Sequence, residues 1–166
     1  MDIKKTLFSG CSRNTNLVKF LDIKKANLED VDGIYSLIEK NARIGKMLYR
    51  TKDELAYRIR DFFVCEDDSE EVLGCCGLRI WTKKASEIYA LAVHCDYQHN
   101  GIGSSLIKIC IEEAKSLKSP FICTFTFDYE FFKNRGFEKV SLSKLPRKIF
   151  TEKTINREKV MGLRPI

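Results

Sequence analysis

The amino-acid sequence predicts a single α/β (α+β) domain in which helices flank a mixed sheet. Three observations favour this fold. The chain has 166 residues, of which 44% are hydrophobic and 31% are charged, and this suits one globular core. Apolar runs typical of strands alternate with amphipathic runs typical of helices. Their order is one strand, two helices, three strands, a helix, a strand, a short helix and two strands, which indicates a mixed sheet.

The first part of the chain predicts a strand followed by two capped helices. Val18–Lys24 loosely alternates apolar and polar residues, as a half-buried strand does. Asn27 is a typical N-cap, and the acidic residues after it suit the first turn of a helix. Thr51 opens T-K-D-E, a capping-box sequence. The two helices are expected at Leu28–Lys40 and Lys52–Arg60, with a loop between them.

The rest of the chain predicts strands around one long helix. The acidic turn D-D-S-E joins two strand-like runs into a hairpin, and E-I-Y-A-L-A-V-H-C follows as a long central strand. A glycine-containing turn then leads into an amphipathic helix, and Gly136 closes a later, shorter helix. The strands are expected at Phe62–Glu66, Val72–Lys83, Glu87–Cys95, Phe121–Phe127, Phe137–Val140 and Arg157–Leu163. The helices are expected at Ile102–Leu117 and Tyr129–Asn134.

Charge and hydropathy exclude several classes of protein. The net charge is +6, with the basic residues concentrated at both ends around a mildly acidic middle. This pattern suits a small anionic ligand or solvated tails, whereas a nucleic-acid binder shows a basic stripe interleaved with aromatics. Apolar runs are too short to span a bilayer, and the start lacks the apolar stretch of a secretory signal. We expect a cytoplasmic protein without nucleic-acid or membrane partners, in which residues 1–16 form a basic extension and 17–166 the domain.

The cysteines indicate reduced, buried thiols. Their number, seven, is odd, which does not favour a disulfide framework. Five of them lie in apolar runs, where cysteine acts as a small hydrophobic residue: Cys65, Cys75, Cys76, Cys110 and Cys123. No C-x-x-C spacing is present, so we expect no metal site.

The segment Leu91–Ile107, L-A-V-H-C-D-Y-Q-H-N-G-I-G-S-S-L-I, carries the main functional signal. An apolar strand ends, a turn with two glycines follows, and a helix begins at once. Glycines there let a ligand approach the backbone, and the first N–H groups of a helix bind anions such as phosphate. A structural tight turn is the alternative interpretation of this pattern.

Two motifs make the sequence resemble the GNAT superfamily of N-acetyltransferases. Gln98–Gly103 matches its Q/R-x-x-G-x-G/A acyl-CoA signature, and F-F-K-N-R-G-F at 131–137 is similar to its second motif. A closer resemblance is to the acetyltransferase domain of bacterial N-acetylglutamate synthases of the short stand-alone type, carried also by Y-R-T at 49–51, by 87–97 and by N-R-E-K-V at 156–160. Two departures are Cys95, where the family has proline, and Phe127, where it has arginine or a similar residue. The second departure bears on the acceptor pocket.

The resemblance implies a mainly antiparallel GNAT sheet that binds acetyl-CoA where the central strands splay, with no metal. It assigns the cofactor to the end of the central strand, the glycine turn and the second motif. The residues concerned are Leu91, Ala92, Val93, Gln98, Asn100, Gly101, Ile102, Gly103, Ser104, Phe132 and Arg135. The family's usual tyrosine acid is Phe132 here, and Tyr129 is an alternative. A thiol of pKa near ~8.5 leaves adequately as the anion without an acid.

The chemistry of the acceptor points to a carboxylate base and to basic binding residues. The acceptor's ammonium must lose a proton, and Glu87, unexpected in so apolar a run, is our candidate base, with His94 as the alternative. Arg50, Arg157 and Lys159 lie in the synthase-like segments, and guanidinium groups bind carboxylates by two parallel hydrogen bonds. We therefore predict an amino-acid N-acetyltransferase that acetylates the α-amine of glutamate for arginine biosynthesis, with a homodimer left open. The alternatives are another amine or a protein N-terminus as acceptor, a non-catalytic acyl-CoA-binding module, and a nucleic-acid binder.

Overall fold

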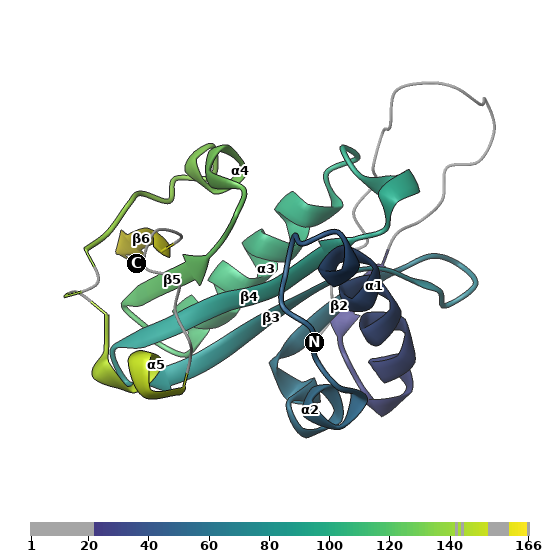
Figure 1. Cartoon of the computed structure of the whole chain (residues 1–166), viewed down its shortest axis with the longest axis horizontal. Helices are drawn as coiled ribbons and strands as arrows, with labels where there is room; N and C mark the ends of the chain where they lie inside the picture. Colours follow the sequence, from purple (N-terminus) through teal and green to yellow (C-terminus); the bar gives the residue numbers. More distant parts are fainter. Residues whose placement is uncertain (1–21, 142, 144, 153–159, 166) are drawn as a thin grey trace. The chain divides into compact units, whose positions relative to one another are not determined.

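The computed structural model describes residues 22–141, 143, 145–152 and 160–165 (Figure 1). Its strands are β1 Asp22–Lys25, β2 Phe62–Glu66, β3 Val72–Thr82, β4 Ala85–Val93, β5 Phe121–Phe125 and β6 Val160–Pro165. Its helices are α1 Val31–Arg43, α2 Lys52–Tyr57, α3 Ile102–Ser116, α4 Tyr129–Lys133 and α5 Arg147–Glu152. Short 3₁₀ turns lie at Leu28–Asp30, Ile59–Asp61 and Cys95–Tyr97.

The strands form one mixed sheet, as predicted. Their hydrogen-bonded order is β1-β2-β3-β4-β5-β6 among the residues described. β1 pairs with β2 and β5 with β6 in antiparallel fashion, whereas β4 and β5 are parallel. The β4–β5 pairing joins Ser86–Ile88 to Ile122–Thr124, so the last residues of β4 lie beyond it. By contacts the chain divides into two compact units, residues 1–76 with 90–107, and 77–89 with 108–166.

In the first unit, local capping sequences fix where the helices begin. The Asn27 side chain accepts a hydrogen bond from the Glu29 N–H, and Asp30 completes a capping box. Thr51 and Glu54 form the second predicted box, each side chain bonding the other's backbone N–H at 3.1 and 3.0 Å. The predicted start of α2 at Lys52 is confirmed, whereas α1 begins at Val31 and ends at Arg43, three residues after each predicted end. The turn Leu28–Asp30 is nevertheless 3₁₀, and α2 ends at Tyr57 before a second 3₁₀ turn.

Gly74 on β3 lets the start of α3 pack closely against the strand in the first unit. A Cβ at Gly74 would lie 2.8 Å from Ile102 Cγ2 and 3.1 Å from Leu106 Cδ1. Ile102 and Leu106 are 1% and 0% exposed, so the apolar face of the helix presses directly onto the strand. The glycine at this position therefore lets the turn that precedes α3 sit close to the sheet.

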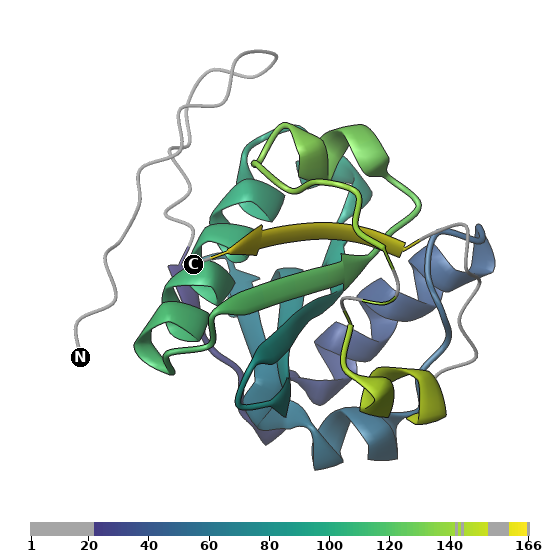
Figure 2. The ribbon, with the colours of Figure 1, turned by 90° about the vertical axis from the view of Figure 1, so that its left-hand side faces the viewer.

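The second unit has its own apolar core. Trp81, Cys123, Leu145 and Ile149 are buried together, with Phe121 and Phe125 packed against them. Figure 2 shows β6 lying along β5, and their antiparallel register runs from Phe121↔Pro165 to Phe125↔Val160. The core thus draws on β3, β5, the segment before α5 and α5 itself.

Several predicted boundaries of strands and helices are wrong. Phe137–Val140 is not a strand, because the Gly136 and Phe137 N–H groups donate to Lys133 and Phe132 carbonyls at 2.9 and 3.2 Å and close α4. Helix α5 was not predicted, because its Ile149 packs against residues that are distant in sequence, Trp81 and Cys123. The central strand begins at Ala85 and ends at Val93, two residues before each predicted end. The parts of the first and last predicted strands at 18–21 and 157–159 lie outside the described residues.

The described cysteines are buried, as predicted, apart from Cys95, and all six are free thiols. Burial raises the pKa of the Cys65 and Cys75 thiols to about 12. No helix in the described part of the chain is long and apolar enough to cross a membrane.

These environments predict selective alkylation. Iodoacetamide at pH 8 should modify Cys95 and leave the five buried cysteines intact in the native protein, because alkylation needs an accessible thiolate. Peptide mass spectrometry, with denatured protein as control, measures the modified positions. Modification of Cys75 as fast as that of Cys95 would contradict the packing of β3.

Candidate active site

The predicted cofactor turn links the end of β4 to the start of α3. The Gln98 side chain donates from Nε2 to the Val93 carbonyl at 3.1 Å, which ties the turn back to the strand. His99 and Gly101 adopt left-handed backbone angles, with φ of 64° and 85°. The first i→i−4 bond of the helix runs from the Ser105 N–H to the Gly101 carbonyl at 3.0 Å. The structure therefore brings Gln98, Asn100, Gly101, Ile102, Gly103 and Ser104 together in one compact turn.

This turn is suited to an anion. The amides of Ile102 and Gly103 precede the first helical hydrogen bond, and the positive end of the helix dipole coincides with them. Asn100 and Gly101 are exposed, whereas Ile102 is buried. A phosphate could therefore reach the backbone while the Ile102 side chain anchors the helix beneath it.

The strand that carries the other cofactor candidates contains an unpredicted feature. Ala90 has φ of 51° inside β4, in the left-handed region that residues with a Cβ rarely occupy. Leu91, Ala92 and Val93 follow it directly, outside the β4–β5 pairing. A left-handed residue breaks the regular alternation of a strand, and such strain often accompanies functional sites. Nothing in the local sequence signals it.

Glu87 is buried inside β4. It is 1% exposed and pairs in register with Cys123 of β5. Trp81 of β3 donates a hydrogen bond from Nε1 to Glu87 Oε2 at 2.8 Å. Glu87 is therefore not an exposed strand end, because β4 begins two residues before it. Trp81 was missed by sequence reasoning, since its contact with Glu87 depends on pairing between strands.

The second motif forms α4 and its closing turn. Phe132 is 4% exposed and packs edge-on against Phe131 and Phe137, with both ring centroids 5.4 Å away. The Arg135 guanidinium lies 3.5 Å from the Phe131 ring centroid and donates to the Phe131 carbonyl. Burial lowers the pKa of Arg135. Tyr129, the alternative acid, is half-buried with Lys139 Nζ 5.1 Å from its ring.

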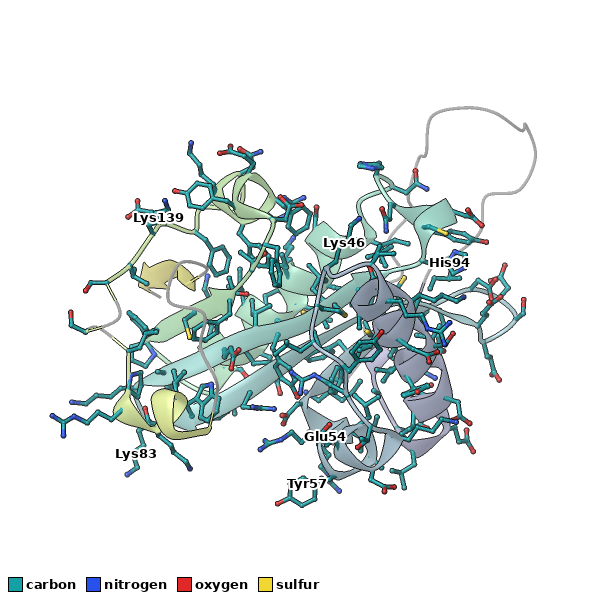
Figure 3. The ribbon with its side chains drawn as sticks, viewed as in Figure 1. Lys46, Glu54, Tyr57, Lys83, His94 and Lys139 are labelled. Carbon is teal, nitrogen blue, oxygen red and sulfur yellow. The ribbon has the colours of Figure 1, made fainter. Side chains whose placement is uncertain are left out.

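Of the predicted acceptor residues, Arg50 lies in the described part of the chain and lines a hollow. The hollow has a volume of about 410 Å³ and lies between α1 and the start of α2; Glu54 on its rim is labelled in Figure 3. Its lining residues are Tyr35, Tyr49, Arg50, Thr51, Lys52 and Glu54. Arg157 and Lys159 lie outside the described residues.

His94, the alternative base, instead caps a turn. It follows the last residue of β4, and its Nδ1 accepts a hydrogen bond from the Asp96 N–H at 3.4 Å. Its ring packs edge-on against Tyr97 at 5.8 Å (His94 is labelled in Figure 3). His94, Cys95 and Asp96 place donor atoms within 4.8 Å of one another. The capping bond accounts for this proximity, and we expect no metal there.

Comparison with known proteins decides the family. Residues 58–139 match the model of an acetyltransferase (GNAT) domain. An uncharacterized N-acetyltransferase, CT2212, of Chlorobaculum tepidum is 32% identical over 136 residues, which cover 80% of this chain and 84% of that protein. The chain belongs to the GNAT family of acetyltransferases. The predicted family and fold are therefore confirmed, and the protein is an acyltransferase.

Two further relatives of this GNAT acetyltransferase are larger proteins. The amino-acid acetyltransferase of Pseudomonas paraeruginosa is 31% identical over 131 residues, covering 77% of this chain and 30% of that protein. The structure of N-acetylglutamate synthase from Neisseria gonorrhoeae, complexed with coenzyme A and N-acetyl-glutamate, superposes with a TM-score of 0.80 and 27% identity. The match covers 88% of this chain and 35% of that one. This GNAT chain thus spans about a third of the length of these two relatives.

Proposed function

We propose that this protein is an acetyl-CoA-dependent amino-acid N-acetyltransferase that acetylates the α-amine of L-glutamate. The observation that carries the proposal is the buried Glu87 of β4, which accepts a hydrogen bond from Trp81 of β3. The same strand β4 continues through Leu91–Val93 into the turn that is suited to an anion. One strand thus presents a carboxylate base and leads into the cofactor turn. The likeness to an N-acetylglutamate synthase bound to coenzyme A and N-acetyl-glutamate supports both substrates.

Acetyl-CoA is expected to bind through hydrogen bonds from the protein backbone to its pyrophosphate and pantetheine. Its pyrophosphate would lie on the turn at 98–104, where helix N–H groups converge. Its pantetheine amides would pair with the backbone of Leu91–Val93, whose N–H groups also polarise the thioester carbonyl. Phe132 and Arg135 are proposed as cofactor residues from the resemblance of their motif alone.

The transfer removes two protons from the acceptor nitrogen and expels a thiolate. Glu87 takes the first proton from the acceptor's ammonium, directly or through water, and the free amine attacks the thioester carbon. A C–N bond forms, the attacking nitrogen gives its second proton to water, and the C–S bond breaks as the tetrahedral intermediate collapses to the amide. The thiolate leaves as the anion or takes a proton from Tyr129 or water, since Phe132 has no proton to give.

The acceptor's two carboxylates would meet basic side chains. Arg50 lines the hollow beside α2, and Arg157 and Lys159 belong to the synthase-like carboxy-terminal segment. A glutamate acceptor would place the protein in arginine biosynthesis in the cytoplasm, and a homodimer remains an expectation of the same proposal.

A thiol-release assay with acetyl-CoA and a panel of amino acids and polyamines tests the function. We expect glutamate to be acetylated best and glutamine less well, because a guanidinium built for an anion meets a neutral amide. Efficient acetylation of spermidine without glutamate would overturn the anionic acceptor. Binding of acetyl-CoA without turnover on any amine, protein N-termini included, would indicate a non-catalytic module, and a salt-sensitive gel shift would indicate nucleic-acid binding.

Removing one guanidinium from the proposed acceptor site should weaken the binding of glutamate but not that of acetyl-CoA. Loss of one partner of a buried, hydrogen-bonded charge pair costs about 2–5 kcal/mol, or roughly 30-fold or more in affinity. Arg50→Ala and Arg157→Ala should each raise the KM for glutamate by that factor and leave the KM for acetyl-CoA nearly unchanged. Arg60→Ala, at an exposed position of the same residue type, is the control. Equal changes in the two KM values would remove Arg50 or Arg157 from the acceptor site.

A further inference from the structure

Arg79 of β3 is a buried cation that the catalytic scheme does not use. Its side chain stands in the apolar run V-L-G-C-C-G-L-R-I-W-T, and the residue is 8% exposed. Its Nε is fully buried and has no hydrogen-bond partner among the described residues. The guanidinium carbon lies 4.6 Å from the Tyr89 ring centroid and 5.1 Å from that of Trp81. The rings of Trp81 and Tyr89 therefore flank the cation.

No carboxylate in the described part of the chain lies within ion-pair distance of Arg79. The first unit shows the usual arrangement instead, where Lys24 Nζ reaches the buried Glu66 Oε2 at 2.8 Å. Ring faces attract a cation but do not replace the two hydrogen bonds that a carboxylate gives to the edge of a guanidinium. A buried charge without such a partner is costly to keep. An anionic ligand would supply the carboxylate that Arg79 lacks.

The neighbours of Arg79 connect it to the base. Arg79 and Trp81 are two residues apart on β3, and Glu87 and Tyr89 are two residues apart on β4, so each pair shares one face of the sheet. The Trp81 indole stacks against Arg79 and donates its N–H to Glu87. The Tyr89 ring also lies over Gly77, where an added Cβ would be 2.6 Å from its Cε1. These contacts fix the cation and the carboxylate around the same indole, within the second unit.

We propose that Arg79 binds a carboxylate of the acceptor amino acid while Glu87 receives the proton of its ammonium. An amino acid carries both charges within a few bonds, so it complements a fixed guanidinium and a fixed carboxylate. This inference rests on the proposed amino-acid acetyltransferase function and adds a specificity residue to it. Either the α-carboxylate or the side-chain carboxylate supplies the same chemistry.

The test compares Arg79→Met with Arg60→Met. Methionine keeps much of the buried volume without the charge, so Arg79→Met should raise the KM for glutamate about 30-fold or more. Its melting temperature should stay equal or rise, because an unpaired buried charge is removed. Arg60→Met, at an exposed arginine, should change neither quantity. Arg79→Lys keeps the charge but loses the planar fork, and we expect its KM to lie between those of the wild type and Arg79→Met.

Acceptor analogues identify the carboxylate. If Arg79 binds the α-carboxylate, Arg79→Met should impair acetylation of glutamine as strongly as that of glutamate and spare the α-amide of glutamate. The reverse pattern assigns the side-chain carboxylate. A folded Arg79→Met protein with wild-type KM for glutamate overturns this proposal alone, as does a lower melting temperature with unchanged KM. Wild-type protein that acetylates no carboxylate-bearing amine overturns the proposed function as well.

Discussion

Glu87→Gln is expected to lower kcat by about 100-fold or more at neutral pH. Glutamine keeps the size of the side chain and can still accept the Trp81 hydrogen bond, but it cannot take a proton from the acceptor. Activity should recover partly as the pH rises, because the free amine then forms without a base. Steady-state kinetics from pH 7 to 10 with saturating acetyl-CoA measure both effects.

Trp81→Phe is the matched variant for this prediction. It keeps an aromatic ring in the core formed with Cys123, Leu145 and Ile149, but it removes the N–H that holds Glu87. We expect a smaller fall in kcat than in Glu87→Gln, with the base still present. Wild-type kcat in Glu87→Gln at neutral pH would move the proton transfer to His94 or to water alone.

Gly101→Val is expected to abolish measurable acetyl-CoA binding. Gly101 has φ of 85° and is exposed at the start of α3. A β-branched side chain strains this backbone angle and occupies the space expected for the pyrophosphate. Titration calorimetry with acetyl-CoA measures the affinity, and circular dichroism checks that the protein remains folded.

Gly45→Val provides the control for backbone strain. Gly45 has φ of 73°, close to that of Gly101, and a Cβ there would meet nothing within 4 Å. The substitution should therefore cost stability without affecting acetyl-CoA binding. A folded Gly101→Val protein that binds acetyl-CoA with wild-type affinity would show that the pyrophosphate lies elsewhere.

Features encoded by short stretches of sequence were predictable. The caps at Asn27 and Thr51 and the closure at Gly136 involve residues at most a few positions apart, so the sequence pattern already contains both partners. The cofactor turn belongs to the same class. Helix α5, by contrast, contributes Ile149 to a core with Trp81 and Cys123, and no local pattern specifies such distant partners.

The acceptor side of the site was predictable only in part. Glu87 was recognised because a carboxylate is unexpected inside an apolar run, and the same signal applies to Arg79 in the preceding strand. What sequence could not supply was the contact between Trp81 of β3 and Glu87 of β4, which links the base to the indole beside Arg79. The left-handed angle of Ala90 was equally hidden, because alanine carries no conformational signature.

The conformation of Ala90 also limits how this strand can change during evolution. A residue with a Cβ at φ of 51° costs about 1–2 kcal/mol, and branched side chains are harder still to accommodate. Glycine would relieve that cost, but it would add roughly 0.5–1 kcal/mol of chain entropy to be lost on folding. The relief is the larger of the two effects, so glycine is the substitution that this backbone angle favours. Substitutions at this position should therefore be confined to the smallest side chains, whereas the neighbouring Tyr89 is restricted by the contacts of its ring with Arg79 and Gly77.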